Sequence, residues 1–290
     1  MSKAAVKAIK FFERFADTGL RGKISAKFFS GLLKLIHPRS KVIDDNLKLA
    51  YPESSEQWRS EIRSKVYENL AWTLTEALAL QRDNTQALKW VKSVKNFEFT
   101  QGLMDNNKGA VFVTAHFGNW ELYGNWMAQQ EMMNGRKLYV VYQEMHDSDI
   151  SAYVQQTRTR GGMVMLNKDV SVMKMIHLLR SGAHIAVLND VAGTGKMNVP
   201  FMGHDATNMP GPAIMAMLAG VPIITACLYR TAPFEHEAEF SDPIIEKKPT
   251  ETLSHDERMR IIIGEYNNLL ERFIRRKPEL WFWLHKRWRP

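Results

Sequence analysis

The chain has 290 residues, of which 45% are hydrophobic, so it is long enough for one large domain with a sizeable core. Its 39 Lys and Arg residues against 31 Asp and Glu residues give a formal net charge of +8, which favours an acidic partner such as anionic lipid. The single cysteine, Cys227, excludes an intrachain disulfide framework, and the sequence has no zinc-ligand spacing and no nucleic-acid recognition motif.

Residues 1 to 41 carry ten basic side chains but only two acidic ones. Apolar residues recur at helical spacing from Ile9 to Leu20 and again from Phe28 to Ile36. The pattern predicts two amphipathic, basic helices that lie on an anionic membrane surface, with ordinary surface helices as the alternative. Charged residues interrupt the segment too often for a membrane span, and a signal-peptide pattern is absent.

The next segment, residues 42 to 108, is predicted to be mainly helical. Apolar residues recur every four positions within 56 to 80, which predicts a helix that faces the core. A second helix is predicted over 81 to 90. It is followed by an alternating stretch, 91 to 99, that is typical of a strand.

The most informative stretch is GAVFVTAHFGNWE, residues 109 to 121, where an apolar strand runs directly into a turn and a helix. His116 stands at the end of the strand, and Glu121 lies in the first turn of the helix. Open α/β sheets place their ligands at such strand ends. We expect the Glu121 carboxylate to hold the His116 imidazole in one tautomer, so that His116 can act as a general base. From the spacing alone, the alternative is a buried histidine near a helix start.

Strands and helices alternate through the rest of the chain. Strands are predicted at 137–142, 163–166, 184–188 and 222–229, an edge strand at 235–240, and helices at 147–160, 170–180, 212–219 and 254–276. This alternation predicts a central, largely parallel or mixed sheet with helices on both faces. The stretch 206–229 has no charge, but its prolines and glycines favour a buried helix followed by a strand over a membrane span.

Four further residues are candidates because of their positions. Asp190 follows a predicted strand, so it should share a sheet edge with His116. There it either orients an arginine or a polar head group, or caps the next turn. Gly211 precedes a helix, so its backbone amide either faces an anionic group or simply starts the helix. Arg158 and Arg160 form an R-x-R pair, which in isolation is typical of a solvated surface.

The C-terminal segment, residues 278 to 290, mixes aromatic and basic side chains. Two interpretations fit this composition equally well: a membrane interface, or packing against the N-terminal helices. The residues concerned are Trp281, Phe282, Trp283, His285, Lys286, Arg287, Trp288 and Arg289.

Taken together, these segments resemble the late acyltransferases of lipid A biosynthesis, within the superfamily of lysophospholipid acyltransferases that carry a His-x4-acidic box. HFGNWE resembles that box, with Glu at the acidic position. The other matches run in order from residue 46 to residue 287: Asn46-Leu47 with Tyr51-Pro52-Glu53, Arg158 and Arg160 with Gly162, Asp190, Pro200-Phe201-Met202-Gly203, Thr207 with Gly211-Pro212-Ala213, and Pro278-Glu279 with Trp283-Leu284-His285-Lys286-Arg287.

The resemblance implies a glycerolipid-acyltransferase-like α/β fold and a membrane-associated enzyme. Such an enzyme moves a fatty acyl chain from a thioester, of acyl carrier protein or coenzyme A, to a hydroxyl of a lipid A precursor or a similar glycolipid. His116 and Glu121 would be catalytic, and Arg158 or Arg160 would bind substrate together with Asp190, with no metal, cofactor or covalent enzyme intermediate. The chain departs from the family pattern at Ala192, where many members carry a second acid.

We therefore expect a monomer with a membrane-associating segment over residues 1–41 and an acyltransferase domain over 42–290, bound peripherally at the cytoplasmic face of a bacterial inner membrane. No nucleic-acid partner is expected. A lysophospholipid or a mannosylated lipid is the alternative acceptor. A non-catalytic, basic lipid-binding protein is the alternative of another class, against which the intact His116 and Glu121 argue.

Overall fold

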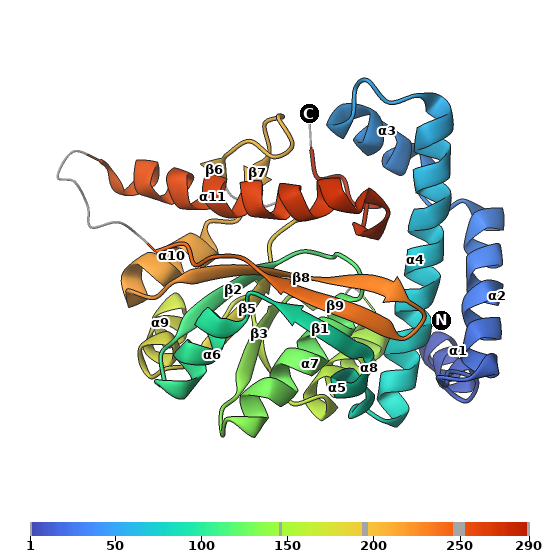
Figure 1. Ribbon diagram of the computed structural model, residues 1–290, viewed down its shortest axis with the longest axis horizontal. Coiled ribbons are helices and arrows are strands. Elements are labelled where there is room, and N and C mark those ends of the chain that lie inside the picture. The colour runs from blue at the N-terminus through green and yellow to red at the C-terminus, as the bar shows by residue number, and fades with distance from the viewer. Residues whose placement is uncertain (1, 145–146, 193–196, 246–252, 289–290) are drawn as a thin grey trace.

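The computed structural model describes residues 2–144, 147–192, 197–245 and 253–288, which form a seven-stranded sheet between layers of helices (Figure 1). The strands of this sheet, from one edge to the other, are β1 (Val91–Lys95), β9 (Glu235–Phe240), β8 (Ile223–Ala232), β2 (Ala110–Thr114), β5 (His184–Leu188), β3 (Leu138–Tyr142) and β4 (Met163–Asn167). Two short strands, β6 (Met197–Asn198) and β7 (Thr207–Asn208), pair separately.

The helices largely fall where the periodicity of the sequence predicts them. They are α1 (Ser2–Glu13), α2 (Leu20–Ile36), α3 (Ser40–Ala50), α4 (Glu56–Arg82), α5 (Gln86–Trp90), α6 (Glu98–Asp105), α7 (Trp120–Met133), α8 (Ser148–Arg160), α9 (Val172–Arg180), α10 (Gly211–Ala219) and α11 (His255–Arg276), with a short 3-10 turn, η1 (Pro278–Leu280). Ser254 caps α11 through a reciprocal pair of bonds with Glu257. The predicted α/β class is confirmed.

The sheet is parallel from β8 through β2, β5 and β3 to β4, and β9 runs antiparallel to β8. The prediction that 235–240 is an edge strand is wrong, because β1 pairs with β9 and takes the edge. The alternating glutamates of β9 are typical of a solvent-exposed edge strand, which explains the wrong prediction. In the structure two of them form ion pairs, Glu237 with Lys95 of β1 and Glu239 with Arg276 of α11. The predicted strand over 91–99 ends early, and α6 begins at Glu98.

The central strand β2 separates two apolar layers. All five of its residues are buried. Val111 and Val113 pack into one core cluster, which includes residues of α9, α10 and α11, and Ala110 and Phe112 pack into the other, which includes residues of α7. Side chains of a strand point alternately to its two faces, so a strand covered by helices on both sides is apolar throughout.

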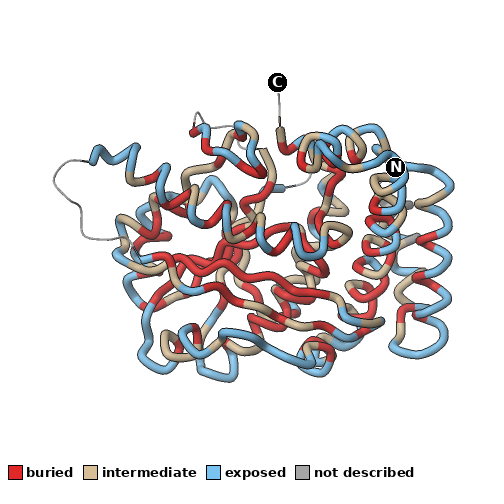
Figure 2. Tube along the Cα trace, turned by 45° about the horizontal axis from the view of Figure 1, so that its top comes forward, coloured by how far each residue is buried: buried red, intermediate tan, exposed pale blue. Residues whose placement is uncertain are grey.

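The long helix α4 runs across the end of both layers, and α1 and α2 lie on its outer side (Figure 1). Two helices therefore occupy the segment in which two amphipathic helices were predicted. Their outer surface is largely exposed (Figure 2), including Leu20, at 74%, and Leu35, at 79%. Within the described ranges, no helix combines the length and the apolar character that crossing a bilayer requires.

Candidate active site

Two neighbouring strands bring His116 and Asp190 together. β2 and β5 are parallel, with Thr114 opposite Leu188, and each candidate residue lies two positions beyond its strand. The His116 ring donates from Nδ1 to Asp190 Oδ1 at 2.8 Å, and the backbone amide of His116 donates to Oδ2 at 2.8 Å. The prediction that the two residues share a sheet edge is confirmed.

The Asp190 carboxylate is 2% exposed and has a third donor, Trp281 Nε1, at 2.8 Å. Burial opposes its ionisation. The positive charge of His116 and the hydrogen bonds outweigh that effect and lower the pKa of Asp190 to about 2. An ionised carboxylate only accepts, so Nδ1 of His116 carries the proton and Nε2 keeps its lone pair. With 25% of its side chain exposed, His116 is accessible to a substrate.

Glu121 has a different partner from the one that its spacing predicts. Arg158 donates to both carboxylate oxygens, from Nε at 3.0 Å and from a terminal nitrogen at 2.6 Å. Burial would raise the pKa of Glu121, but the Arg158 guanidinium and then the charge of His116 hold it below its usual range. The expected hydrogen bond, in which His116 would donate to the Glu121 carboxylate, is not among the contacts of the described residues. Asp190 occupies Nδ1 instead, because strand pairing brings it there from 74 residues away.

The R-x-R-x-G segment closes α8 and has two unlike arginines. Arg158 is half-buried at Glu121, whereas Arg160 is exposed, because residues two apart on a helix point in different directions. Gly162 follows with φ +93, and a Cβ there would lie 2.6 Å from the Met132 sulfur. The segment therefore positions Arg158 and closes α8 tightly against α7.

The C-terminal segment forms one wall of the site. The Phe282 amide donates to the His116 carbonyl at 2.9 Å, and the Gly118 amide donates to the Leu280 carbonyl at 2.8 Å. Trp281 is 2% exposed and Trp283 is fully buried. Of the two interpretations of this segment, packing is therefore the one that holds for these two tryptophans, while Arg289 lies outside the described residues.

Three rings surround the His116 imidazole. Their centroids lie 5.2 Å away for Trp120, 5.5 Å for His285 and 6.0 Å for Phe282. Aromatic walls exclude water and so strengthen the electrostatic interactions of a general base with its partners. In the described part of the chain, no cluster of three or more His, Cys, Asp or Glu side chains is placed to hold a metal ion.

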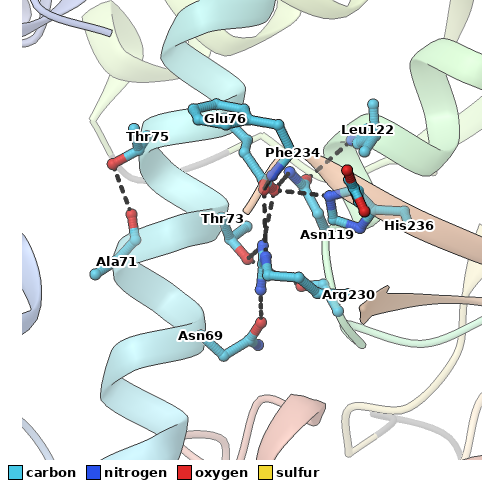
Figure 3. Close-up of polar contacts among 12 residues, drawn as sticks. Asn69, Ala71, Thr73, Thr75, Glu76, Asn119, Leu122, Arg230, Phe234 and His236 are labelled. Carbon is cyan, nitrogen blue, oxygen red and sulfur yellow. Dashed lines mark hydrogen bonds and ion pairs between the residues drawn. The ribbon is translucent and has the colours of Figure 1, made fainter. Parts of the chain in front are cut away.

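A buried network under the site fixes the turn after His116 (Figure 3). Asn119 caps α7 by accepting from the Leu122 amide at 2.9 Å, and its side-chain amide donates to Glu76 at 2.8 Å. Thr73, one turn away on α4, donates to the Gly118 carbonyl at 2.9 Å. Glu76 thereby links α4 to the start of the helix that carries Glu121.

The partners of Glu76 come from two neighbouring strands, Arg230 from β8 and His236 from β9. Arg230 Nη2 lies 2.8 Å from the Glu76 carboxylate and His236 Nε2 lies 3.1 Å from it, and Arg230 also bonds Asn69 (Figure 3). Burial would raise the pKa of Glu76, but Arg230 first and His236 second hold it far below its usual range. Burial also lowers the pKa of His236, although Glu76 partly opposes this.

Gly118 meets a steric requirement of the same turn. Its φ is +58, and a Cβ would lie 1.8 Å from the Leu228 carbonyl oxygen. Only glycine fits this close approach of turn and β8.

Gly211 begins α10, and a Cβ there would meet open space. Among the described residues, no hydrogen bond joins it to His116, Glu121 or Asp190, so its role in binding stays a prediction. Sequence reasoning did not assign Trp281, Phe282, Asn119 or Glu76 to the site. For Trp281 and Phe282, the resemblance of the C-terminal segment to the family was the available signal. Glu76 lies inside an ordinary apolar helix pattern, so the sequence gave no signal for it.

Cys227 is buried in β8, and burial raises the pKa of its thiol well above the ordinary value. We expect Cys227→Ala to retain acyl-transfer activity, at a stability cost of about 1 kcal/mol. The check is the specific activity of the purified variant beside its melting temperature. Complete inactivation of a folded Cys227→Ala protein would point instead to a thiol nucleophile.

Comparison with known proteins agrees with this geometry. The profile of the family described as bacterial lipid A biosynthesis acyltransferase matches residues 20–290. The lipid A biosynthesis palmitoleoyltransferase of Escherichia coli K12 is 23% identical over 256 residues, which cover 87% of this chain and 79% of the relative. The lipid A biosynthesis lauroyltransferase of the same organism is 25% identical over 262 residues, covering 89% and 81%. The chain is therefore an acyltransferase that belongs to the bacterial lipid A biosynthesis acyltransferase family.

Proposed function

We propose that the protein transfers a fatty acyl chain from a thioester to a hydroxyl group of a lipid A precursor. The observation that carries this proposal is the His116 imidazole, whose Nδ1 is held by the buried, ionised Asp190 while the ring stays partly exposed. That arrangement suits a general base. The names of the relatives at 23% and 25% identity support the acceptor class.

In the proposed step, Nε2 of His116 takes the proton of the acceptor hydroxyl as the hydroxyl oxygen attacks the thioester carbonyl. Asp190 stabilises the resulting imidazolium. The C–S bond then breaks, and the thiolate leaves with the proton that His116 returns, which gives an ester and a thiol. Asp190, which the sequence assigned to substrate binding, thus takes the orienting role that the sequence gave to Glu121.

Glu121 and Arg158 act as a second unit in this proposal. The bidentate bond fixes the planar guanidinium against Glu121, and Glu121 lies close enough to His116 for the charge of His116 to lower its pKa. From this position Arg158 would bind a substrate oxygen that gains negative charge. Glu121 is then a positioning residue for Arg158. Arg160 and Gly211 remain predicted substrate contacts. Acyl carrier protein remains the predicted acyl donor, and its acidic character would suit the basic chain. The monomeric state and the domain boundary near residue 42 also remain predictions.

The test is a reconstituted reaction. Purified protein is given an acyl thioester of acyl carrier protein or of coenzyme A together with purified lipid A precursor. Thiol release and the mass of the lipid product are followed. Thiol release that depends on the precursor supports the proposal. Binding of the precursor without any acyl transfer would favour a non-catalytic lipid-binding protein.

We also propose that α1 and α2 attach the protein peripherally to an anionic membrane. Phe11, Ile24 and Phe28 on these helices, and Phe15 in the turn between them, are exposed at 43% to 57%, within the segment whose basic side chains outnumber its acids. An apolar, basic surface of this kind binds by burial of apolar groups and by attraction to anionic lipid.

Deleting residues 1–18 should weaken co-sedimentation with anionic vesicles, and salt should weaken it for the full chain, because exposed charges are screened. The control is a full-length variant in which Phe11 and Phe15 are replaced by serine, which keeps the charge. Binding that persists in both proteins would contradict this attachment.

A further inference from the structure

His285 is a polar ring in the wall of the site that the proposed reaction does not yet use. Its centroid lies 5.5 Å from that of His116 and 4.7 Å from that of Phe282, and the residue is half-buried. No hydrogen bond to either of its ring nitrogens comes from the described residues. A polar ring beside a catalytic imidazole without a protein partner is available to a substrate.

The main chain around His285 is fixed from two sides. Asn46 Nδ2 donates to the carbonyls of Trp283, at 2.8 Å, and His285, at 2.6 Å, and Arg39 donates to the carbonyl of Leu284 at 3.0 Å. Asn46, which belongs to one of the segments that resemble the family, therefore positions the C-terminal segment from helix α3.

On the other side, Arg287 is fully buried and anchors the chain. It donates to the carbonyls of Val191 and Thr207 and to the side chain of Asn208, and its guanidinium lies over the Phe201 ring. Because the backbone around His285 is held on both sides, His285 loses less conformational entropy when it binds a ligand. Such preorganisation is typical of residues in binding sites.

The charges around His285 favour its neutral form. Burial lowers its pKa most, and the positive charges of His116 and Arg39 lower it further, while Asp190 partly opposes them. Of the two imidazoles, His116 makes the direct bond to Asp190. His285 then stays neutral, with one nitrogen that donates and one that accepts.

We propose that His285 binds a hydroxyl group of the acceptor lipid, so that the neighbouring hydroxyl lies at Nε2 of His116. The ligand class is a polyhydroxylated sugar or a hydroxyacyl chain of a glycolipid. The proposal rests on the acyltransferase function proposed above and adds a specificity-determining residue to it.

The experiment compares His285→Phe with His285→Gln in steady-state kinetics, with purified lipid A precursor as acceptor and a single acyl thioester as donor. Phenylalanine keeps a flat ring against Phe282 but forms no hydrogen bond, whereas glutamine keeps a donor and an acceptor. The KM for the acceptor should rise about tenfold in His285→Phe and much less in His285→Gln, while the KM for the thioester stays unchanged. Melting temperatures show that both variants are folded.

A binding measurement separates this role from catalysis. His116→Ala protein should bind the precursor, and His116→Ala/His285→Phe should bind it about tenfold more weakly. An unchanged acceptor KM in His285→Phe, with normal transfer by the wild type, would overturn the role of His285 alone. A fall in kcat as large as that of His116→Ala would also overturn it, because it would make His285 a base. No transfer by the wild type would refute the proposed function as well.

Discussion

His116→Ala should lower the rate of acyl transfer by roughly 10²-fold or more while the protein stays folded, because His116 is the imidazole that the buried Asp190 carboxylate orients to take the hydroxyl proton. Asp190→Asn should cause a loss of similar order. Its side-chain amide can donate to Nδ1 of His116 and so favour the tautomer whose Nε2 has no lone pair. The measurement is kcat/KM for wild type and variants under one set of conditions.

Double-mutant cycles decide which acid works with which base. Since Asp190 bonds His116 and Arg158 bonds Glu121, the His116/Asp190 double variant should be scarcely worse than His116→Ala alone. The Glu121/Arg158 double variant should likewise resemble its worse single variant. Strong coupling of Glu121 to His116, with none between His116 and Asp190, would contradict the assignment. Losses that follow the melting temperatures would indicate a purely structural histidine.

Glu76→Gln should lower the free energy of unfolding by about 3 to 5 kcal/mol, because it leaves the buried Arg230 guanidinium without its counter-ion. For a chain of this size, that loss corresponds to a melting temperature lower by roughly 10 °C. Activity at a temperature where the variant is folded should also fall, because Glu76 accepts from Asn119 and so holds the turn after His116. Denaturant unfolding and kcat are the two readouts.

The chain has a matched control in Glu131. This fully buried carboxylate bonds His184 and Arg136 at the opposite end of β5. Glu131→Gln should therefore destabilise the protein to a similar degree while kcat of the folded protein is retained. If both variants lost kcat alike, Glu76 would have no specific role in positioning the site.

The Glu76 network also gives stability a pH dependence of definite sign. The folded-state pKa values of Glu76 and His236 are both lower than their ordinary values. The contribution of His236 is complete above the ordinary histidine pKa of about 6.5 and diminishes as the pH falls below it, and that of Glu76 diminishes below about 4.3. Unfolding free energies measured from pH 8 downward should therefore decrease. Glu76→Gln should make the decrease at low pH smaller without abolishing it, because Asp190 and Glu121 also have lowered pKa values.

The sequence by itself determined the local elements and the position of the site. An apolar run ending at His116 and a turn before Trp120 correctly predicted strand β2 and helix α7, and the same periodicity correctly predicted the largely parallel sheet. These features depend on neighbours within a few residues, because side-chain periodicity and turn chemistry are local. For the same reason, the sequence could show that Asp190 lies at the edge where His116 stands.

The tertiary structure decided the partners. The strand order places β5 beside β2, so Asp190 rather than Glu121 meets His116, and Glu121 is left to Arg158 of α8. Sequence spacing cannot choose between two acids, because the choice depends on pairing over 74 residues. The same holds for the C-terminal segment, because its aromatic and basic composition is compatible both with a membrane interface and with packing in the core. Long-range contacts decide between the two: the antiparallel bridge between Phe117 and Trp281, and the bond from Trp281 to Asp190, bring that segment to the catalytic turn.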